Sequence, residues 1–230
     1  MMSDALKSSG RDIVFSISEY GLFKSHDWAP EFANLWRTTD DLIASFDSIL
    51  RTLDLQENLY PYSKPGAWND PDMLQVGNGS LTLSENRTHM YLWAVLNAPL
   101  MAGNDLIRMS DEVRDLLIHP GIIAIDQDWG GHQGRLVYSV GEAQVWSKPM
   151  SDGSKASVLL SRGETKQAFK LAETTNIEVR EEAGGVDRVR LDQRDMPRAD
   201  PQPQLPGEQD VRHDQGADRR PAVVRAIAIG

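Results

Sequence analysis

The sequence predicts an α/β protein: the C-terminal half of a TIM (β/α)8 barrel followed by an antiparallel β-sandwich domain, which is incomplete. Four units of short strand, polar loop and helix follow one another in the first 130 residues, which is typical of parallel βα units. From residue 131 onward, short strands separated by turns replace the helices, which is typical of an antiparallel sandwich. A complete barrel has eight βα units in typically about 250 residues, so four units correspond to half of one.

The first unit is preceded by a helical pattern over residues 1–10, which ends at Gly10. No capping residue precedes this pattern, so we expect the helix to be part of a longer, truncated one. Residues 13–17 are mostly β-branched and aromatic and predict a buried strand, which ends in the polar loop 18–21.

The second unit consists of a strand predicted at residues 32–37 and a helix predicted at residues 42–53. Apolar residues recur in this helix at positions i, i+3, i+4 and i+7. The acidic, hydroxyl-rich segment 38–41 is expected to form the start of that helix, where carboxylates and hydroxyls are favourable.

The third unit has a strand at residues 67–69 and a helix at residues 85–97, which the capping-box residues of segment 82–85 introduce. The fourth unit begins with the apolar segment 99–102. It ends with a helix near residues 110–118, which opens on Ser-Asp-Glu.

Three regions follow from these patterns: the half barrel (1–130), an antiparallel β domain (131–180) and an aberrant or disordered tail (181–230). Strands of the β domain are expected at residues 135–138, 143–147, 156–160 and 167–171. The tail contains no Phe, Tyr, Trp, Lys, Ser, Thr or Asn. It is interpreted either as a charge-balanced disordered segment or, as we favour, as the product of a shifted reading frame that replaces the last strands. An unbroken frame through codon 180 in resequenced DNA would contradict the second interpretation.

The composition excludes several functions. A net charge of −10 argues against nucleic-acid or anionic-membrane partners, which require a basic surface. The absence of cysteine excludes disulfides, thiolate catalysis and cysteine-bound zinc. The five histidines lack metal-ligand spacing, so neither a metal nor another cofactor is expected. No apolar run reaches the ~18–20 residues that cross a bilayer.

Two polar runs, residues 34–41 and 68–74, each combine a Trp, hydrogen-bonding side chains and at least two carboxylates. An indole face can stack on a sugar ring, Arg, Asn and Asp can bind its hydroxyls, and a carboxylic acid can protonate a glycosidic oxygen. The alternative is two polar loops that happen to contain Trp. We favour a sugar site because both runs follow apolar segments within a short stretch of sequence.

These segments resemble the α-galactosidases of glycoside hydrolase family 27. The matching segments are residues 10–21, 34–41, 66–74, 92–100, 103–106 and 124–128, and the match is collinear over roughly residues 5–180. The resemblance implies a (β/α)8 barrel with a C-terminal antiparallel β domain and a retaining mechanism. In that mechanism one aspartate attacks the sugar, and a second protonates the leaving oxygen and later activates water.

The resemblance also implies roles for individual residues. Asp41 resembles the acid/base catalyst, because it ends a Trp-Arg-x-x-x-Asp pattern. An acid of this kind needs a raised pKa from partial burial or a neighbouring carboxylate. Arg37, Asp72 and Met73 match residues that line the sugar pocket. Glu19 matches the residue that accepts hydrogen bonds from the galactose 2-hydroxyl.

Neighbouring residues are assigned structural roles. Asp40 is expected to face solvent or cap a helix, because alternate residues of an extended segment point to opposite sides. Trp68 and Asp70 are expected at the base of their loop, and Trp93 in the core. Tyr20 stands where many family members have Trp, which alters one wall of the pocket.

The nucleophile of the family is an aspartate in a Lys-x-Asp motif on the fourth barrel strand, and this chain has no such motif in that context. The resemblance therefore implies that this chain supplies an acid but forms no glycosyl-enzyme, so that alone it is inactive. An open half barrel exposes sheet edges and apolar faces, so we expect association with the missing N-terminal half or with a second copy.

Three functions remain open at this stage. The first is an α-galactosidase acting on α-galactosides. The second is a related specificity, α-N-acetylgalactosaminidase or β-L-arabinopyranosidase; Glu19 disfavours the former, which has a small residue at that position. The third is a non-catalytic sugar-binding remnant.

Overall fold

A small parallel sheet and its helices form the first part of the chain in the computed structural model, which describes residues 2–163, 188–189 and 224–229. In chain order, its elements are α1 (Met2–Ser8), β1 (Ser16–Ile17), α2 (Ser25–Trp28), the 3-10 helix η1 (Ala29–Glu31), β2 (Leu35–Arg37), α3 (Phe46–Asp54), β3 (Trp68–Asp70), α4 (Leu83–Leu96), α5 (Asp111–Leu117) and α6 (Pro120–Asp126). The strands pair in parallel in the order β1-β2-β3, with Leu35 opposite Trp68 and Arg37 opposite Asp70. The prediction of parallel βα units is therefore confirmed for three units.

A second sheet follows the helices. Its strands are β4 (Arg135–Val140), β5 (Ala143–Pro149), β6 (Lys155–Ser161), β7 (Arg188–Val189) and β8 (Val224–Ile229), in the order β4-β5-β6-β8-β7. Three of the four strands expected in the β domain are confirmed, and the fourth lies outside the described residues. Strand β8 runs parallel to β6, whereas the other neighbours are antiparallel. The described part of this region is thus one mixed sheet, and the second layer of the predicted sandwich is not among the described residues. Within the predicted aberrant tail, only β7 and β8 are described.

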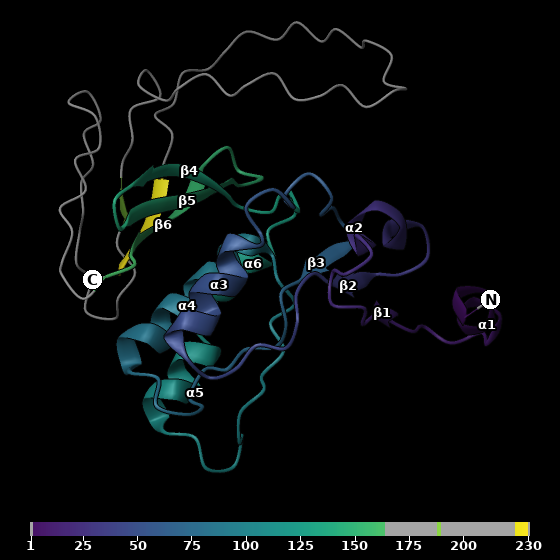
Figure 1. The fold of residues 1–230 in the computed structure, drawn as a ribbon, viewed down its shortest axis with the longest axis horizontal. Coiled ribbons are helices and arrows are strands. Elements are labelled where there is room, and N and C mark those ends of the chain that lie inside the picture. Colours follow the sequence, from purple (N-terminus) through teal and green to yellow (C-terminus); the bar gives the residue numbers. More distant parts are fainter. Residues whose placement is uncertain (1, 164–187, 190–223, 230) are drawn as a thin grey trace, which may run out of the picture.

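Helix α4 is at the centre of the larger core. It begins with the predicted capping box, in which Thr82 and Glu85 bond to each other's backbone N–H groups. From Met90 to Leu96 every residue is buried, because α3, α5 and α6 pack around the helix together with β5 and β6. Figure 1 shows these helices below the second sheet and to one side of the parallel strands, with α1 apart at the N-terminal end. None of the described helices is long and apolar enough to cross a membrane.

The first predicted strand is shorter and more exposed than expected. Only Ser16 and Ile17 form β1, whereas Ile13 and Val14 lie outside it and are 40% and 75% exposed. In the described part of the chain, β1 pairs with β2 alone. Its other edge is therefore open, and the apolar residues leading into it are left without cover.

The helix of the second unit begins later than predicted. Ser45 caps α3, its hydroxyl accepting a hydrogen bond from the Ser48 N–H, and segment 38–41 is not part of the helix. A contact distant in sequence explains the difference: the Leu42 N–H donates to Asp72 Oδ2 at 2.7 Å. The residues between β2 and α3 are thereby held as a loop beside β3.

The fourth unit lacks a regular strand. Its predicted segment forms only an isolated parallel bridge between Leu74 and Ala102, with bonds from the Leu74 N–H to Met101 O and from the Gly103 N–H to Leu74 O. Pro99 has no N–H to donate to a ladder, which limits pairing at the start of this segment. The predicted helix that follows is confirmed as α5, with Ser110 as its cap.

A buried lysine connects the second sheet to the helices. Lys148 of β5 is fully buried, and its Nζ donates to Asn97 Oδ1 and, at 2.6 Å, to the carbonyl of Ile125. Burial lowers the pKa of Lys148 to about 8, although Asp126 and Asp128 oppose the change. Burial raises the pKa of Asp126 to about 7, opposed by the charge of Lys148.

Candidate active site

Arg37, the last residue of β2, is the centre of the candidate active site. Its Nη2 lies 2.9 Å from Asp72 Oδ2 and 3.3 Å from Asp41 Oδ1, so one guanidinium bridges two of the predicted site carboxylates. The ring of Tyr20 covers the guanidinium, with the ring centroid 5.5 Å from Cζ. Because β2 and β3 are parallel, the loops that follow them meet at one edge of the sheet.

Two buried polar atoms at this site have no hydrogen-bond partner among the described residues. They are Arg37 Nε, a donor, and Thr39 Oγ1, which can donate or accept. Buried polar groups are nearly always paired, and the exceptions gather at functional sites. An arginine with a free buried N–H is suited to donate a hydrogen bond to the oxygen of a sugar hydroxyl.

Asp72 has a backbone conformation that non-glycine residues rarely adopt, with φ of 89°. Hydrogen bonds hold it on every side. Its N–H donates to Asp70 Oδ1 at 2.9 Å, and its carbonyl accepts from the Trp93 indole at 2.8 Å. Its carboxylate accepts from the Leu42 and Met73 N–H groups as well as from Arg37. The strain is thus offset by contacts that aim the carboxylate at Arg37.

Asp70 and Trp93 therefore do more than the sequence indicated. Trp93 lies in the core, as predicted, and Asp70, expected at the base of its loop, is buried too; each also holds the backbone of Asp72 through a hydrogen bond. Burial raises the pKa of Asp70, whereas the hydrogen bond from the Asp72 N–H and the charge of Arg37 act to lower it. No signal in the sequence predicts the bond from Trp93, because the indole and the carbonyl that it contacts are 21 residues apart.

The side chains of the adjacent residues Asp40 and Asp41 have different partners. The Asp41 side chain is 75% exposed and turns to Arg37, whereas that of Asp40 is 63% exposed and pairs with Arg51 at 3.3 Å. This arrangement agrees with the prediction that only one of the two aspartates faces the site. Asp40 was expected either to cap a helix or to face solvent, and in the structure it faces solvent. The described residues bury neither carboxylate, so Asp41 lies at the open rim of the site.

Glu19 has a structural contact in addition to its predicted role. Its two carboxylate oxygens accept the backbone N–H groups of Phe23 (2.8 Å) and Ser25 (3.1 Å), which folds the loop after β1. The Ser25 hydroxyl donates to the Arg37 carbonyl and ties this loop to β2. Glu19 is half-buried, and each of its oxygens retains acceptor capacity. The 2-hydroxyl role remains a prediction.

Met73 follows Asp72 and is 42% exposed. It lies on the loop after β3, where the Gly103 backbone approaches closely: a Cβ on Gly103 would lie 3.6 Å from Met73 Cβ. Its place beside Asp72 fits a pocket-lining role. The structure therefore brings Arg37, Asp41 and Asp72 into direct contact, with Met73 adjacent and Glu19 on the neighbouring loop.

We expect Gly21→Ala to destabilise the loop that carries Glu19 and Tyr20. Gly21 has φ of 76°, and an added Cβ would lie 2.3 Å from the Thr38 carbonyl oxygen, a backbone atom that cannot move aside. The free energy of unfolding should fall by about 2–3 kcal/mol, measured by urea unfolding with tryptophan fluorescence.

The matched control for this variant is Gly10→Ala. Gly10 also has a positive φ, of 70°, but nothing lies within 4 Å of an added Cβ. The free energy of unfolding should therefore fall by at most about 2 kcal/mol, the cost of the left-handed conformation alone. Equal losses in the two variants would contradict the close contact with Thr38.

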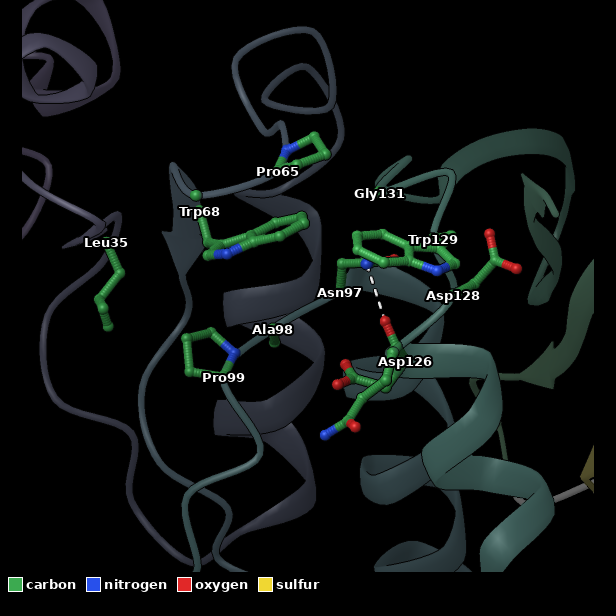
Figure 2. Close-up of a pocket in the computed structure, with 12 residues that line it drawn as sticks. Leu35, Pro65, Trp68, Asn97, Ala98, Pro99, Asp126, Asp128, Trp129 and Gly131 are labelled. Carbon is green, nitrogen blue, oxygen red and sulfur yellow. Dashed lines mark hydrogen bonds between the residues drawn. The ribbon is translucent and has the colours of Figure 1, made fainter. Parts of the chain in front are cut away.

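A pocket of about 440 Å³ lies away from Arg37 and was not predicted from the sequence. Figure 2 shows Trp68 and Trp129 on one side of it and Pro99 and Asp126 on the other. It opens at the N-terminal ends of β2 and β3, whereas active sites on parallel strands lie at the C-terminal ends. The only signal for it in the sequence is the polar, Trp-containing run 126–131. Among the described residues, no group of three or more His, Asp or Glu could hold a metal ion.

Parallel strands that end in an arginine and a set of carboxylates are suited to binding sugar hydroxyls and protonating a glycosidic oxygen. The fold therefore defines the class of this chain as α/β, with a candidate sugar-binding site at the C-terminal ends of its parallel strands.

Comparison with known proteins agrees with this class. Residues 1–128 match the sequence profile of the family described as Alpha galactosidase A. An alpha-galactosidase of Oryza sativa subsp. japonica is 40% identical over 176 residues, which cover 76% of this chain and 42% of that protein. An alpha-N-acetylgalactosaminidase of Rattus norvegicus is 41% identical over 172 residues, covering 70% and 41%. The solved structure of an alpha-galactosidase from Saccharomyces cerevisiae superposes with a TM-score of 0.63 at 27% identity, covering 70% of this chain and 42% of that one.

The chain belongs to the alpha-galactosidase A family, glycoside hydrolase family 27. It spans about two fifths of the length of the relatives it matches.

Proposed function

We propose that this chain supplies the acid/base carboxylate and the sugar-binding side chains of a retaining glycoside hydrolase that releases terminal α-linked galactose. The observation that carries the proposal is the contact of Arg37 with both Asp41 and Asp72 at the C-terminal ends of parallel strands. The alpha-galactosidases among its relatives support the choice of galactose.

Each residue has a defined task in this proposal. Arg37 donates its free Nε–H to a sugar hydroxyl, and Asp72, held rigid by its own hydrogen bonds, accepts from another. Met73 covers the apolar side of the ring, and Glu19 accepts from the 2-hydroxyl. Asp41 protonates the leaving oxygen and then removes a proton from water. Binding of the substrate aglycone over the exposed Asp41 would shield its carboxyl group from water.

The proposal places the nucleophile outside this chain. A retaining enzyme needs a second carboxylate about 5–5.5 Å from the first, on the other face of the sugar. The second carboxylate that Arg37 holds, Asp72, is locked to backbone N–H groups and is assigned to binding. We infer that residues 1–130 form the second half of a barrel, with an antiparallel β domain after it, and that four preceding βα units supply the nucleophile. The open edge of β1, with exposed Ile13 and Val14, is where such units would pair.

A two-part experiment tests this function. The purified 230-residue chain alone should not hydrolyse p-nitrophenyl α-galactoside. Mixing it with the separately produced first half of a relative, ending after the fourth barrel strand, should restore turnover. Turnover by the chain alone would contradict the missing nucleophile. A mixture that forms a complex without turnover, while galactose still binds, would support a non-catalytic sugar-binding protein instead.

The second candidate function is one of the related specificities, hydrolysis of α-N-acetylgalactosaminides or β-L-arabinopyranosides. The relative from rat supports keeping the first of these open. Glu19 favours galactose, because the resemblance implies a small residue at this position in α-N-acetylgalactosaminidases, to admit the acetamide group. Comparing kcat/KM of the assembled enzyme on the three p-nitrophenyl glycosides discriminates among them.

A further inference from the structure

His89, on helix α4, is a fully buried histidine to which the proposed function assigns no task. Its Nε2 accepts a hydrogen bond from the Gln75 N–H at 2.9 Å. Burial lowers the pKa of His89 to about 3, so the imidazole is neutral near pH 7. A neutral ring that accepts at Nε2 has its proton on Nδ1, which is buried with no partner among the described residues. An unpaired buried donor lowers stability, so packing alone does not explain a histidine at this position.

The bond from Gln75 connects His89 to the loop that carries Asp41. The Gln75 side chain donates from Nε2 to the Leu42 carbonyl at 3.2 Å, while its Oε1 accepts from the Asn78 side chain at 2.7 Å. The Leu42 N–H donates to Asp72 Oδ2 at 2.7 Å. Leu42 directly follows Asp41 and is therefore held at both its N–H and its carbonyl. The position of Gln75 thus limits where the Asp41 carboxylate can lie.

A second path from the same imidazole leads to Asp72 through Trp93. The rings of His89 and Trp93 are nearly perpendicular, at 86°, with their centroids 4.1 Å apart. The Trp93 indole N–H donates to the Asp72 carbonyl at 2.8 Å, and Asp72 has the rare φ of 89°. Because the imidazole packs against the indole, it limits rotation of the ring that makes this bond. One path therefore reaches the Asp72 carboxylate, through Leu42, and the other reaches its backbone.

We propose that His89 is a positioning residue for the candidate active site, acting through Gln75 and Trp93. It fixes the loop that follows Asp41 and the strained backbone of Asp72, and it makes no contact with the sugar. The inference rests on the proposed function of these two carboxylates. All of the contacts join described residues, so they form without the βα units that would precede this chain.

Amide hydrogen exchange in the purified chain tests the positioning directly. His89→Leu removes the acceptor of the Gln75 N–H, so the Leu42 amide should exchange at least about tenfold faster than in the wild type. His89→Gln retains a side-chain acceptor and should restore most of the protection. The control is Leu92→Ala, which removes another fully buried side chain of α4 that makes none of these hydrogen bonds. Equal acceleration of the Leu42 amide in His89→Leu and Leu92→Ala, or none in either, would overturn the proposal.

Gln75→Met tests the same path without a change in the core, because Gln75 is only half-buried. The methionine keeps the backbone N–H that donates to His89 but loses the side-chain bond to Leu42. We expect faster exchange of the Leu42 amide in this variant as well, and it keeps the test decisive if His89→Leu does not fold. An unchanged Leu42 amide in Gln75→Met would overturn the path through Gln75.

Kinetics of the enzyme assembled with the first half of a relative separate positioning from loss of folded protein. Displacement of Asp41 in His89→Leu should lower kcat on melibiose, whose leaving oxygen needs a proton, by about 10–100-fold. The loss on p-nitrophenyl α-galactoside should be smaller. A reduced folded fraction lowers both rates in equal proportion, and that result would overturn the proposal. No turnover by the wild-type assembly would instead contradict the proposed function, while exchange of the Leu42 amide still decides whether His89 holds this loop.

Discussion

Asp41→Asn should lower kcat by about 10²–10⁴-fold in the enzyme assembled from this chain and the first half of a relative. The amide has nearly the same shape but no acidic proton for the leaving oxygen. Because the Asp41 side chain is 75% exposed, the substitution should leave folding intact. The loss should be largest for melibiose, whose leaving group requires protonation, and smaller for p-nitrophenyl α-galactoside, whose leaving group does not.

Added azide should restore part of the lost rate and give a galactosyl azide, because an anionic nucleophile needs no general base in the second step. The matched control is Asp40→Asn, which alters the adjacent exposed carboxylate, one that pairs with Arg51. If Asp40→Asn loses as much activity as Asp41→Asn, or if azide has no effect on the latter, the assignment of Asp41 as acid/base is wrong.

Lys148→Met should destabilise the fold by about 2–5 kcal/mol at pH 7.5, because it leaves two buried hydrogen-bond acceptors unpaired, each at a cost of about 1–3 kcal/mol. The methionine cannot donate to Asn97 Oδ1 or to the Ile125 carbonyl, and Asp126 loses its neighbouring cation. Urea unfolding followed by tryptophan fluorescence measures the loss. Lys155→Met, a partly exposed lysine on the next strand, is the control and should change stability by less than about 1 kcal/mol.

Asp126 and Lys148 together predict how the free energy of unfolding changes with pH. The folded-state pKa of Asp126 is about 7, above its ordinary 3.8, so the folded state binds an extra proton between these values and stability falls as pH rises through this range. The folded-state pKa of Lys148 is about 8, below its ordinary 10.5, so stability rises again from pH 8 to 10.5. The contribution of the pair should thus be least favourable near pH 7–8.

Two variants separate the fall in stability due to Asp126 from the rise due to Lys148. Asp126→Asn should flatten the fall in stability below pH 7, and Lys148→Met should flatten the rise above pH 8. Unfolding free energies measured at pH 5, 7.5 and 9.5 give both slopes. An unchanged profile in both variants would show that other groups control the pH dependence.

Local signals in the sequence were sufficient for several elements. The capping box of Thr82 and Glu85 and the Ser110 cap predicted the starts of α4 and α5 because each lies within one helical turn of the groups it bonds. Strands β4, β5 and β6 were predicted because turns at Gly141 and Gly153, both with positive φ, separate them.

Elements that depend on distant neighbours were predicted less well. The start of α3 is displaced because Leu42 bonds to Asp72, 30 residues away. Strand β1 is short and its approach exposed, because only one of its edges is paired in the described part of the chain. Neither the bond to Asp72 nor the unpaired edge of β1 can be recognised in the local pattern from which helix and strand boundaries are predicted.

For the site, the sequence by itself determined which side chains are present and that each follows a parallel strand, because the order of residues and the strand pattern are properties of the chain. It thereby placed Arg37, Asp41 and Asp72 at one sheet edge. Only the tertiary structure decided that the Asp41 carboxylate contacts Arg37 while that of Asp40 pairs with Arg51, that Asp70 and Trp93 hold Asp72 at φ of 89°, and that Lys148 reaches the ends of α4 and α6. These contacts join residues far apart in sequence, and their geometry exists only once the two sheets and the helices have packed.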